Sequence, residues 1–455
     1  MSAVFADLRL LLRGRFSLAV LGVLLLLSGL AVITGLSIVG RQNAAIDRAA
    51  DAQASDLAAV ASEYGKPDGD AGYAAYYTFH PTWDRPSTLA FAAIGQRDIQ
   101  PWILRVRLLG LQSQLYESET INPELTLPGP FDFAFVLLYL APLVVIALMH
   151  DLVTGEREAG RLRLLASLPR RSLGPWWRRT LLRYGLTLAA AILPLWLGGL
   201  SHQAPATGLL VLTLAAALYL AIWFGLALTV AARASSSTAS AMALVGSWIV
   251  LTLIVPGLAS AAIARAVPVD RAIDLTLAQR EHVHHGWDVP KSDTLTPFFA
   301  KHPEWRDTAP IVGRFHWKWY YAMHEAGDDA VSGQVAAYRE SLRRRQTLSD
   351  ALGWVTPAVA LQGVMHRLAD TDLAAQLAYQ DSIHAFHERL KTFYYPYLFR
   401  GRPFTRADFD DLPTYAPRPA GGRTPSAPLL ALALLAGLAF GAAALTLGRP
   451  GRLLR

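Results

Sequence analysis

The sequence contains no cysteine among its 455 residues, and only 17% of its residues are charged. The absence of cysteine excludes disulfide bonds, thiolate zinc sites, iron–sulfur clusters and a cysteine nucleophile. Soluble domains average about 25% charged residues, so the low charge argues against an ordinary soluble enzyme. The 53% of hydrophobic residues exclude an intrinsically disordered chain.

Lysine is also scarce, and the phosphate-binding motif GxxxxGK[ST] is absent. All lysines lie outside the long apolar runs, at Lys66, Lys291, Lys301, Lys318 and Lys391. Because the usual nucleotide-binding loop needs a lysine that reaches the phosphates, we expect this chain to bind neither ATP nor another cofactor. We predict no catalytic residue and expect that the chain is not an enzyme.

Six apolar runs are each long enough to cross a bilayer, which takes about 20 residues in a helix. They cover residues 17–39, 131–149, 184–200, 208–231, 239–263 and 429–447. The first run is longer than the apolar region of a signal peptide, so we interpret it as a retained membrane anchor. The sequence therefore predicts an all-α polytopic membrane protein with six transmembrane helices.

Arginine clusters identify one side of the predicted membrane domain. They occur at the N-terminus, between the second and third runs, after the fourth run and in the C-terminal tail. Since short basic loops stay in the cytoplasm, both termini are expected there. This topology accounts for the net charge of +7, and no nucleic-acid partner is expected.

Two long segments are left on the opposite side, and we expect each to form a mainly helical extracytoplasmic domain. The predicted division is 1–39 for the N-terminus and first span, 40–130 for the first extracytoplasmic domain, 131–149 for the second span, 150–180 for a cytoplasmic segment, 181–263 for spans three to five, 264–428 for the second extracytoplasmic domain and 429–455 for the last span and tail. Helices are expected over about 43–63, 331–348 and 361–390, whereas the proline and glycine of 290–313 favour loops.

The segment after the second span combines acidic residues with an apolar ridge. The ridge consists of Leu162, Leu164, Leu165 and Leu168. This spacing predicts a short helix that ends at Pro169, on which Glu158 and Arg161 are close enough to pair. The periodicity alone favours an amphipathic helix in the lipid interface.

The order of residues in this segment resembles the coupling segment of type-2 ABC exporter permeases. The matching pattern is Glu156-x-Glu158-x-Gly160-x-x-x-Leu164-Leu165-x-Ser167-x-Pro169. In that family an acidic helix after the second of six spans docks on a separate ATPase subunit. The resemblance implies ATPase-coupling roles for Glu156, Glu158, Gly160, Arg161, Leu162, Leu164, Leu165 and Pro169. Arg161 departs from the threonine usual in the family, and it either adapts the helix to a particular ATPase or is merely tolerated.

A second resemblance concerns a branch of these permeases with two large extracytoplasmic segments. It rests on residues 86–90, 93–101, 119–123 and 129–136. The branch is similar to the permeases of nitrous-oxide-reductase maturation and of bacterial gliding. It implies the transmembrane subunit of an ATP-driven exporter in the bacterial inner membrane. A separate ATPase carrying ATP and Mg, and a second permease copy or a related permease, are the implied partners.

Two other functions stay open. The chain can belong to an ABC-type complex that acts mechanically on a periplasmic protein, or to an assembly or metal-handling scaffold. An ion-coupled carrier is disfavoured, because spans one, four, five and six contain no ionisable Asp, Glu, Lys or Arg.

Polar residues near the outer ends of the spans are candidate extracytoplasmic contacts. Gln96, Arg97 and Asp98 form one cluster, for which we favour a buried Arg–Asp pair or a turn over a ligand contact. Asp132 begins the second span, where it either caps the helix or lines an access point to the pathway.

Nine of the 12 histidines lie in the second long segment. His282, His284 and His285 are the candidate ligands for copper or zinc, although packing and hydrogen bonding are the favoured roles. His384 and His387 can share a helix face. His324-Glu325 begins like a zinc-protease helix, but Asp328 replaces the second histidine, so a protease is not expected.

Overall fold

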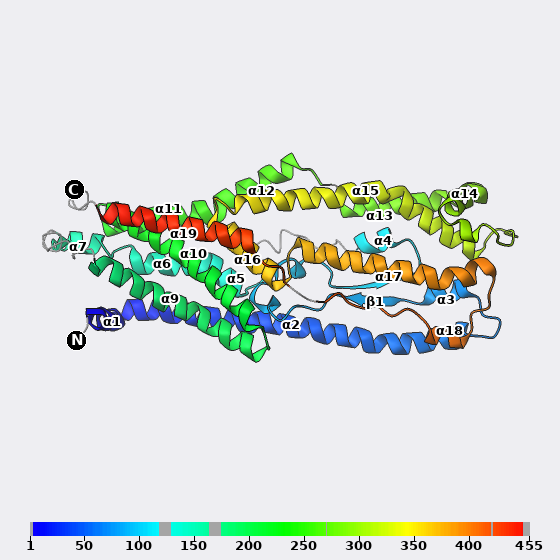
Figure 1. Ribbon diagram of the computed structural model, residues 1–455, viewed down its shortest axis with the longest axis horizontal. Helices are drawn as coiled ribbons and strands as arrows, with labels where there is room; N and C mark the ends of the chain where they lie inside the picture. The colour runs from blue at the N-terminus through cyan, green and yellow to red at the C-terminus, as the bar shows by residue number, and fades with distance from the viewer. Residues whose placement is uncertain (1–2, 118–128, 163–173, 270, 420–421, 449–455) are drawn as a thin grey trace.

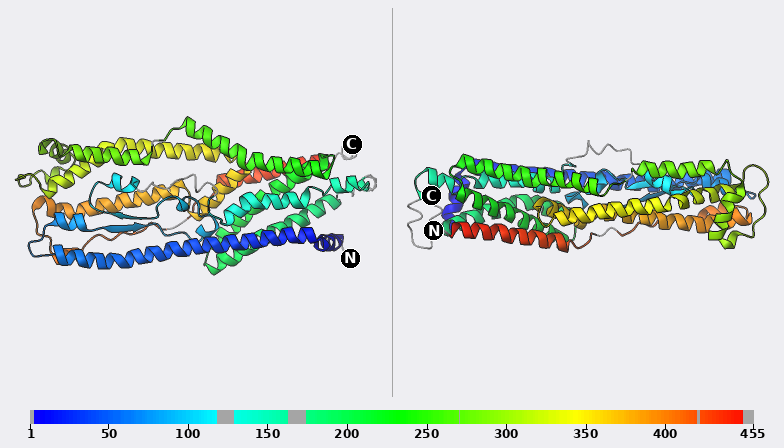
Figure 2. Two further views of the ribbon diagram at one scale, coloured as in Figure 1. Left: turned by 180° about the vertical axis from the view of Figure 1, so that it is seen from behind. Right: turned by 90° about the horizontal axis from the view of Figure 1, so that it is seen from above.

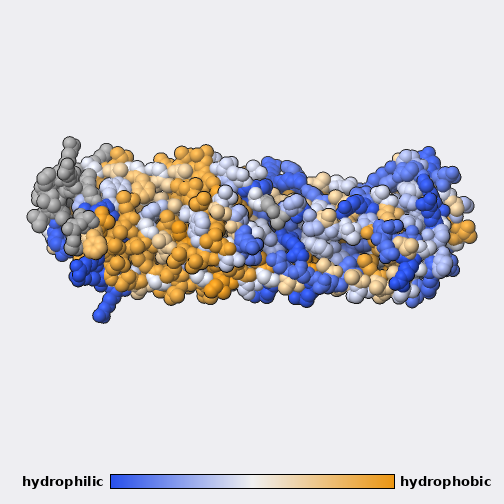
Figure 3. Space-filling view, turned by 60° about the horizontal axis from the view of Figure 1, so that its bottom comes forward, coloured by the Kyte–Doolittle hydropathy of each residue, from blue (hydrophilic) through white to orange (hydrophobic). Residues whose placement is uncertain are grey.

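A computed structural model describes residues 3–117, 129–162, 174–269, 271–419 and 422–448. The molecule is elongated, and long helices run along its axis (Figure 1). One half carries an apolar outer surface, and the other half is largely hydrophilic (Figure 3). The chain is an all-α membrane protein with six helical segments long and apolar enough to cross a bilayer, as the sequence predicts.

The membrane bundle consists of these six segments. They are α2 (Arg15–Tyr64); α5 (Phe133–Phe135), η4 (Val136–Leu140) and α6 (Ala141–Met149), followed by α7 (Thr154–Glu158); α9 (Gly174–Ser201); α10 (Ala206–Arg233); α11 (Ser237–Ile249), η6 (Val250–Ile254) and α12 (Val255–Ala266); and α19 (Ser426–Leu447). A separate helix, α1 (Ala3–Arg13), precedes α2. Each predicted apolar run lies within one of these segments, except that the second run begins two residues before Phe133.

Helix α10 is the centre of the bundle, where it contacts α6, α9, α11 and α19. Trp223 and Phe224 on α10 are fully buried. Gly225 permits the closest approach, because a Cβ atom there would lie 2.8 Å from the backbone carbon of Ala439 on α19. Small residues at such contacts bring helix backbones together in membranes, where no hydrophobic force drives helices together.

Two segments of the bundle contain a π-helical turn just before a proline, η4 before Pro142 and η6 before Pro256. Proline lacks an N–H, so the carbonyl of Leu138, four residues before Pro142, loses its usual helical donor. The hydroxyl of Tyr219 on α10 donates to this carbonyl at 2.8 Å. The neighbouring helix thus satisfies a backbone group inside the bundle, as the apolar environment requires.

The hydrophilic half, which we call the distal body, is built from the distal half of α2 and shorter elements of both long segments. The first segment supplies α3 (Ala71–Tyr77), β1 (His80–Trp83), η1 (Ala90–Ala92), η2 (Gly95–Asp98), β2 (Ile103–Val106) and α4 (Leu111–Tyr116). The second supplies α13 (Ala272–His285), α14 (Lys291–Lys301), η7 (Pro303–Trp305), α15 (Trp317–Leu352), α16 (Pro357–Ala369), α17 (Leu373–Arg400) and α18 (Arg406–Asp410). Strands β1 and β2 pair antiparallel, with His80 opposite Val106. Of these elements, η1, η2 and α16 lie where the distal body meets the bundle.

The two long segments share one hydrophobic core, which differs from the expectation of two separate domains. Buried residues of α3 and α4 pack with those of α15 and α17. The hydroxyl of Tyr321 donates to the carbonyl of Gly72 at 2.9 Å, and the hydroxyls of Thr82 and Tyr379 lie 2.9 Å apart. Large aromatic side chains from both segments, among them Tyr116, Tyr321, Tyr379 and Phe386, make up much of this joint core.

The local helix predictions are partly right. The predicted helix over 43–63 is the continuation of α2, which runs unbroken from the bundle along the distal body (Figures 1 and 2). The predicted helix over 361–390 is interrupted at Asp370, which has φ +58°. The loop predicted over 290–313 is wrong for 291–301, which form α14; its N-cap is Pro290, and proline is compatible with a helix start.

Candidate functional site

The short helix α7 lies at the end of the bundle farthest from the distal body (Figure 1). We call this the arginine-rich end; it carries Arg157, Arg161, Arg178, Arg179, Arg183 and Arg233. Arg157 donates to the carbonyl oxygens of Ala232, at 3.1 Å, and of Ala234. The Glu158 carboxylate accepts from the backbone N–H of Ser237 at 2.7 Å and from its hydroxyl at 2.9 Å. Helix α7 is therefore fixed to the turn between α10 and α11.

The other acidic residue of α7 connects it to α9. Glu156 accepts from Nε of Arg161 at 2.6 Å and from Nη1 of Arg179 at 3.3 Å. Arg179 also contacts Asp7 of α1 at 3.3 Å, and Arg178 pairs with the same carboxylate. One chain of ion pairs thus joins α7, α9 and α1.

The structure corrects the predicted coupling helix. Helix α7 ends at Glu158, so the predicted helix is interrupted there, because Gly160 has φ +69°, a left-handed conformation that glycine adopts without strain. Consequently Arg161 pairs with Glu156, and the predicted pair of Glu158 with Arg161 is wrong. Leu162 is buried against the bundle. The predicted coupling residues Leu164, Leu165 and Pro169 lie outside the described residues.

A cavity of about 220 Å³ lies at the opposite end of the bundle, where it meets the distal body. Three of the predicted contact residues line it, namely Gln96, Asp98 and Asp132. Its other walls are the π-helical turn η4 with the flanking residues of its segment, and Gln362 and His366 of α16. The cavity is thus polar on the side of η2 and α16 and apolar on the side of the second membrane segment.

Asp132 caps a helix, which is one of the two roles considered from the sequence. Its Oδ1 accepts from the backbone N–H of Phe135 at 2.9 Å, which caps α5, and its Oδ2 accepts from the N–H of Ile94 at 2.8 Å. The same carboxylate lines the cavity. It therefore fixes the start of the second membrane segment to the loop that forms the polar wall.

Arg97 points away from this cavity and forms a buried ion pair. Its Nη1 donates to Asp84 at 2.5 Å, and its Nε donates to Gln42 of α2 at 2.9 Å. The expectation of a buried Arg–Asp pair is correct in kind, but the partner is Asp84 and not the adjacent Asp98. Asp84 also contacts Arg418 at 3.2 Å, so this pair joins α2 to the end of the second long segment.

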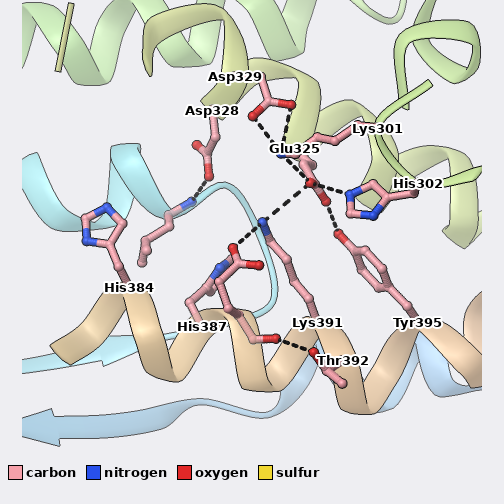
Figure 4. A network of polar contacts seen from close by, with 12 residues as sticks. Lys301, His302, Glu325, Asp328, Asp329, His384, His387, Lys391, Thr392 and Tyr395 are labelled. Atoms are coloured by element: carbon pink, nitrogen blue, oxygen red, sulfur yellow. Dashed lines mark hydrogen bonds and ion pairs between the residues drawn. The ribbon is translucent and has the colours of Figure 1, made fainter. Parts of the chain in front are cut away.

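A second buried polar network lies inside the distal body (Figure 4). The Glu325 carboxylate of α15 accepts from Lys301 and His302, both at 2.8 Å, and from the hydroxyl of Tyr395 at 2.5 Å; Lys391 is 3.7 Å away. Burial raises the pKa of this carboxyl, but Lys391 and the three hydrogen bonds outweigh burial and lower its pKa to about 2. The network joins α14, α15 and α17.

Asp328 does not act as a metal ligand in the manner of the zinc-protease motif. Its carboxylate accepts from the backbone N–H groups of Leu111, at 2.5 Å, and Gln112, at 3.2 Å, at the start of α4. Burial raises its pKa to about 7 against these hydrogen bonds, so its charge is costly in this position.

The predicted metal candidates are exposed, whereas His384 and His387 form hydrogen bonds inside the distal body. His282, His284 and His285 are exposed on α13, and no group of three His, Cys, Asp or Glu side chains able to hold a metal lies within the described ranges. His387 is buried and contacts the carbonyl oxygens of Arg107 and Leu109. His384 contacts Gln112 at 3.0 Å. The predicted metal candidates therefore do not converge with other ligands.

Sequence reasoning missed the residues whose partners are distant in the chain. Ser237, which binds Glu158, and Asp84, which binds Arg97, carry no local pattern. His366 is one of the nine histidines of the second long segment, and no local pattern marks it as a lining residue of the 220 Å³ cavity, which we call the outer cavity. Arg157 belongs to the arginine cluster between the second and third apolar runs, from which only the membrane orientation was predicted. Its place between the two glutamates of the coupling pattern was the available signal.

One family model matches part of the chain. A domain of unknown function (DUF3526) matches residues 274–418, which cover most of the second long segment. No curated protein and no solved structure is significantly similar to the chain.

Proposed function

We propose that this chain is the transmembrane subunit of an ATP-driven ABC exporter of the bacterial inner membrane. The observation that carries the proposal is the attachment of α7: its own side chains connect it to α9 and to the turn between α10 and α11. A helix held in this way passes a displacement at its surface directly to several membrane helices. This is the behaviour that the resemblance to a coupling segment requires.

In this proposal the arginine-rich end faces the cytoplasm, and both termini lie there, in agreement with the positive-inside rule. The distal body is then periplasmic. The ATPase docks on the exposed end of α7, formed by Glu158, Ala159, Gly160 and Arg161. ATP and Mg bind to that partner, because the chain contains no nucleotide-binding loop.

The outer cavity is the proposed release site. It lies beside the π-helical turn of the second membrane segment, and π-helical turns mark positions where a helix changes packing. A movement of α7 is transmitted along α6 to this turn, since α7 follows α6 in the same segment. A second permease copy, or a related permease, completes the complex in the membrane.

Co-purification in mild detergent tests the ATPase partner. We expect ATP hydrolysis to purify with the full chain and to be lost with Ala159→Arg, which adds a bulky charge to the exposed end of α7 without removing a hydrogen bond. Ala54→Arg is the matched control, because Ala54 is exposed on α2 in the distal body. Absence of ATP hydrolysis with the unmodified chain under nucleotide-stabilised conditions would contradict the proposal.

The second candidate function is force transmission to a periplasmic protein, with no solute moved. It is favoured by α2, whose 50 residues form one helix, about 75 Å long at 1.5 Å per residue. A short glycine insertion after Arg48, beyond the predicted first span, distinguishes the two functions. A force transmitter loses complementation of a deletion strain while the associated ATP hydrolysis persists, whereas an exporter retains complementation.

A further inference from the structure

A pocket between α1 and α9 lies at the arginine-rich end, on a different side from the docking surface proposed on α7. It has a volume of about 240 Å³. Its lining residues are Asp7, Leu10, Leu11, Ser17, Arg179, Leu182 and Arg183. The pocket therefore combines two guanidinium groups with three leucine side chains.

Arg183 has unsatisfied hydrogen-bonding groups in this pocket. Its Nε and Nη1 atoms are buried and have no hydrogen-bond acceptor within the described part of the chain. Leaving a buried charged donor unpaired is costly, because the group loses water without gaining a partner. An acceptor from outside the chain removes this cost.

Two carboxylates near the pocket are already engaged by other arginines, and a third, Asp151, attracts Arg183 only through its charge, without a hydrogen bond to the Nε and Nη1 atoms. Asp7 pairs with both Arg178 and Arg179. Glu156 pairs with Arg179 and with Arg161. The group of arginines around the pocket thus outnumbers the carboxylates that pair with it, so the missing acceptor is an anion.

The surroundings of the pocket identify the kind of anion. Helix α1 is amphipathic, and its exposed apolar side chains include Val4, Phe5, Leu10 and Leu12. Ser17 lies at the start of the apolar run of α2, and Arg183 lies on α9 between Leu182 and Tyr184. The pocket is therefore at the level where a membrane helix passes from headgroups to acyl chains, where arginine side chains meet lipid phosphates.

We propose that this pocket binds an anionic phospholipid. The Arg183 side chain lines the pocket, and a rotation that turns its two buried, unpaired nitrogen atoms toward the pocket lets the guanidinium fork donate to the phosphate. Leu10, Leu11 and Leu182 contact the first part of the acyl chain. The bound lipid lies next to Arg179, which connects to Glu156 of α7, so the site is adjacent to the junction that attaches α7.

Native mass spectrometry of the full chain in detergent measures this binding directly. We expect phosphatidylglycerol to bind more tightly than phosphatidylcholine, and Arg183→Gln to weaken its binding by about tenfold or more, because charge-assisted hydrogen bonds are lost. Arg233→Gln is the matched control, since Arg233 is exposed at the same end but does not line the pocket. Its affinity for phosphatidylglycerol should equal that of the unmodified chain.

A second pair of variants tests the site without removing a buried arginine. Leu10 lines the pocket and is 63% exposed, whereas Leu12 is 42% exposed and does not line it. Leu10→Glu should repel the anionic headgroup and weaken binding, and Leu12→Glu should not. If Arg183→Gln does not fold, these two variants still test whether the pocket binds the lipid.

Three results would overturn the proposal. They are equal affinity for the two lipids, unchanged phosphatidylglycerol binding in both Arg183→Gln and Leu10→Glu, and displacement of the lipid by inorganic phosphate. The last result would assign the site to a free anion, because a phospholipid held also by its acyl chain resists such competition.

Discussion

The membrane bundle and the distal body differ in the kind of side chain that they expose. In the fifth membrane segment, α11 to α12, only 11% of the most apolar window is buried, so its apolar side chains face outward. The distal body instead packs aromatic side chains into a core and encloses Glu325 with its basic partners. Lipid and water as surroundings explain the contrast, because apolar groups need no burial in lipid. The candidate functional sites are therefore expected at the two boundaries of the apolar bundle surface.

The charged side chains of the bundle named as candidates lie at its two ends. The bundle carries its ion pairs at the arginine-rich end, where Glu156 and Arg179 connect α7 to α9. It carries Asp132 at the other end, beside the outer cavity. The two candidate sites are thus the two boundaries of the apolar zone. The distal body has ion pairs whose carboxylates are buried, Asp84 with Arg97 and Glu325 with Lys301 and Lys391, and these provide the sharpest test of the contrast.

The largest effect is expected from Glu325→Gln in the distal body. Removing the charge weakens the hydrogen bonds that Lys301, His302 and Tyr395 donate to the buried carboxylate, and the expected loss is about 3 kcal/mol of unfolding free energy, because a hydrogen bond to a charged group contributes about 1.5–3 kcal/mol. Denaturant unfolding followed by tryptophan fluorescence measures this loss. Glu340→Gln on the same helix is the control, since Glu340 is exposed and pairs only loosely with Arg343 at 3.9 Å.

The same carboxylate gives a pH dependence with a defined sign. Its pKa is about 2 in the folded chain, below the ordinary value of 4.5. The stabilisation is therefore present above about pH 4.5 and is lost as the pH falls toward 2. The difference in unfolding free energy between the unmodified chain and Glu325→Gln should shrink over that interval. A constant difference would contradict the assigned ionisation.

The next effect concerns packing inside the bundle. Gly225→Val should force α10 and α19 apart, because a Cβ atom there lies within 3 Å of Ala439. Overpacking of this kind costs about 2 kcal/mol. Gly437→Val on α19 is the matched control, since its Cβ atom meets no other atom within 4 Å. Thermal unfolding in detergent compares the two, and equal losses would refute the proposed close contact.

A smaller effect is expected from Tyr219→Phe. The change removes the hydroxyl that satisfies the Leu138 carbonyl before Pro142, at a cost of about 1 kcal/mol. Thermal unfolding in detergent measures it, with Tyr139→Phe as the control. If Tyr139→Phe lost more thermal stability than Tyr219→Phe, the stabilising hydroxyl would lie on the segment that contains η4 and not on α10.

The smallest effect is expected at the surface of the distal body. Arg85→Gln breaks an exposed pair with Asp47 and should change the unfolding free energy by about 0.5 kcal/mol or less. Arg97→Gln breaks the buried pair with Asp84 and should cost several times more, because both side chains are almost inaccessible. Denaturant titrations of the two variants compare these losses. Similar losses would show that burial does not control the strength of these pairs.

The membrane segments could be predicted from the sequence because an apolar run of sufficient length is a local property. The arrangement of the distal body could not, since Tyr321 and Gly72 meet across 249 residues. For the same reason Asp98 was a plausible partner for Arg97, although Asp84 fills that role. The interruption of the predicted coupling helix between Glu158 and Leu162 could not be predicted, because helical periodicity carries no information about the left-handed conformation of Gly160.

The central claim is that an ATPase binds the exposed end of α7, and site-specific photocrosslinking in intact bacterial membranes tests it most directly. The photoreactive residue replaces Ala159, with Ala54 in the distal body as the control position. The proposal predicts that position 159 forms a crosslink to a nucleotide-binding subunit and that position 54 does not. A crosslink to such a subunit from position 54 would contradict the proposal. The absence of a crosslink from both positions would contradict it as well.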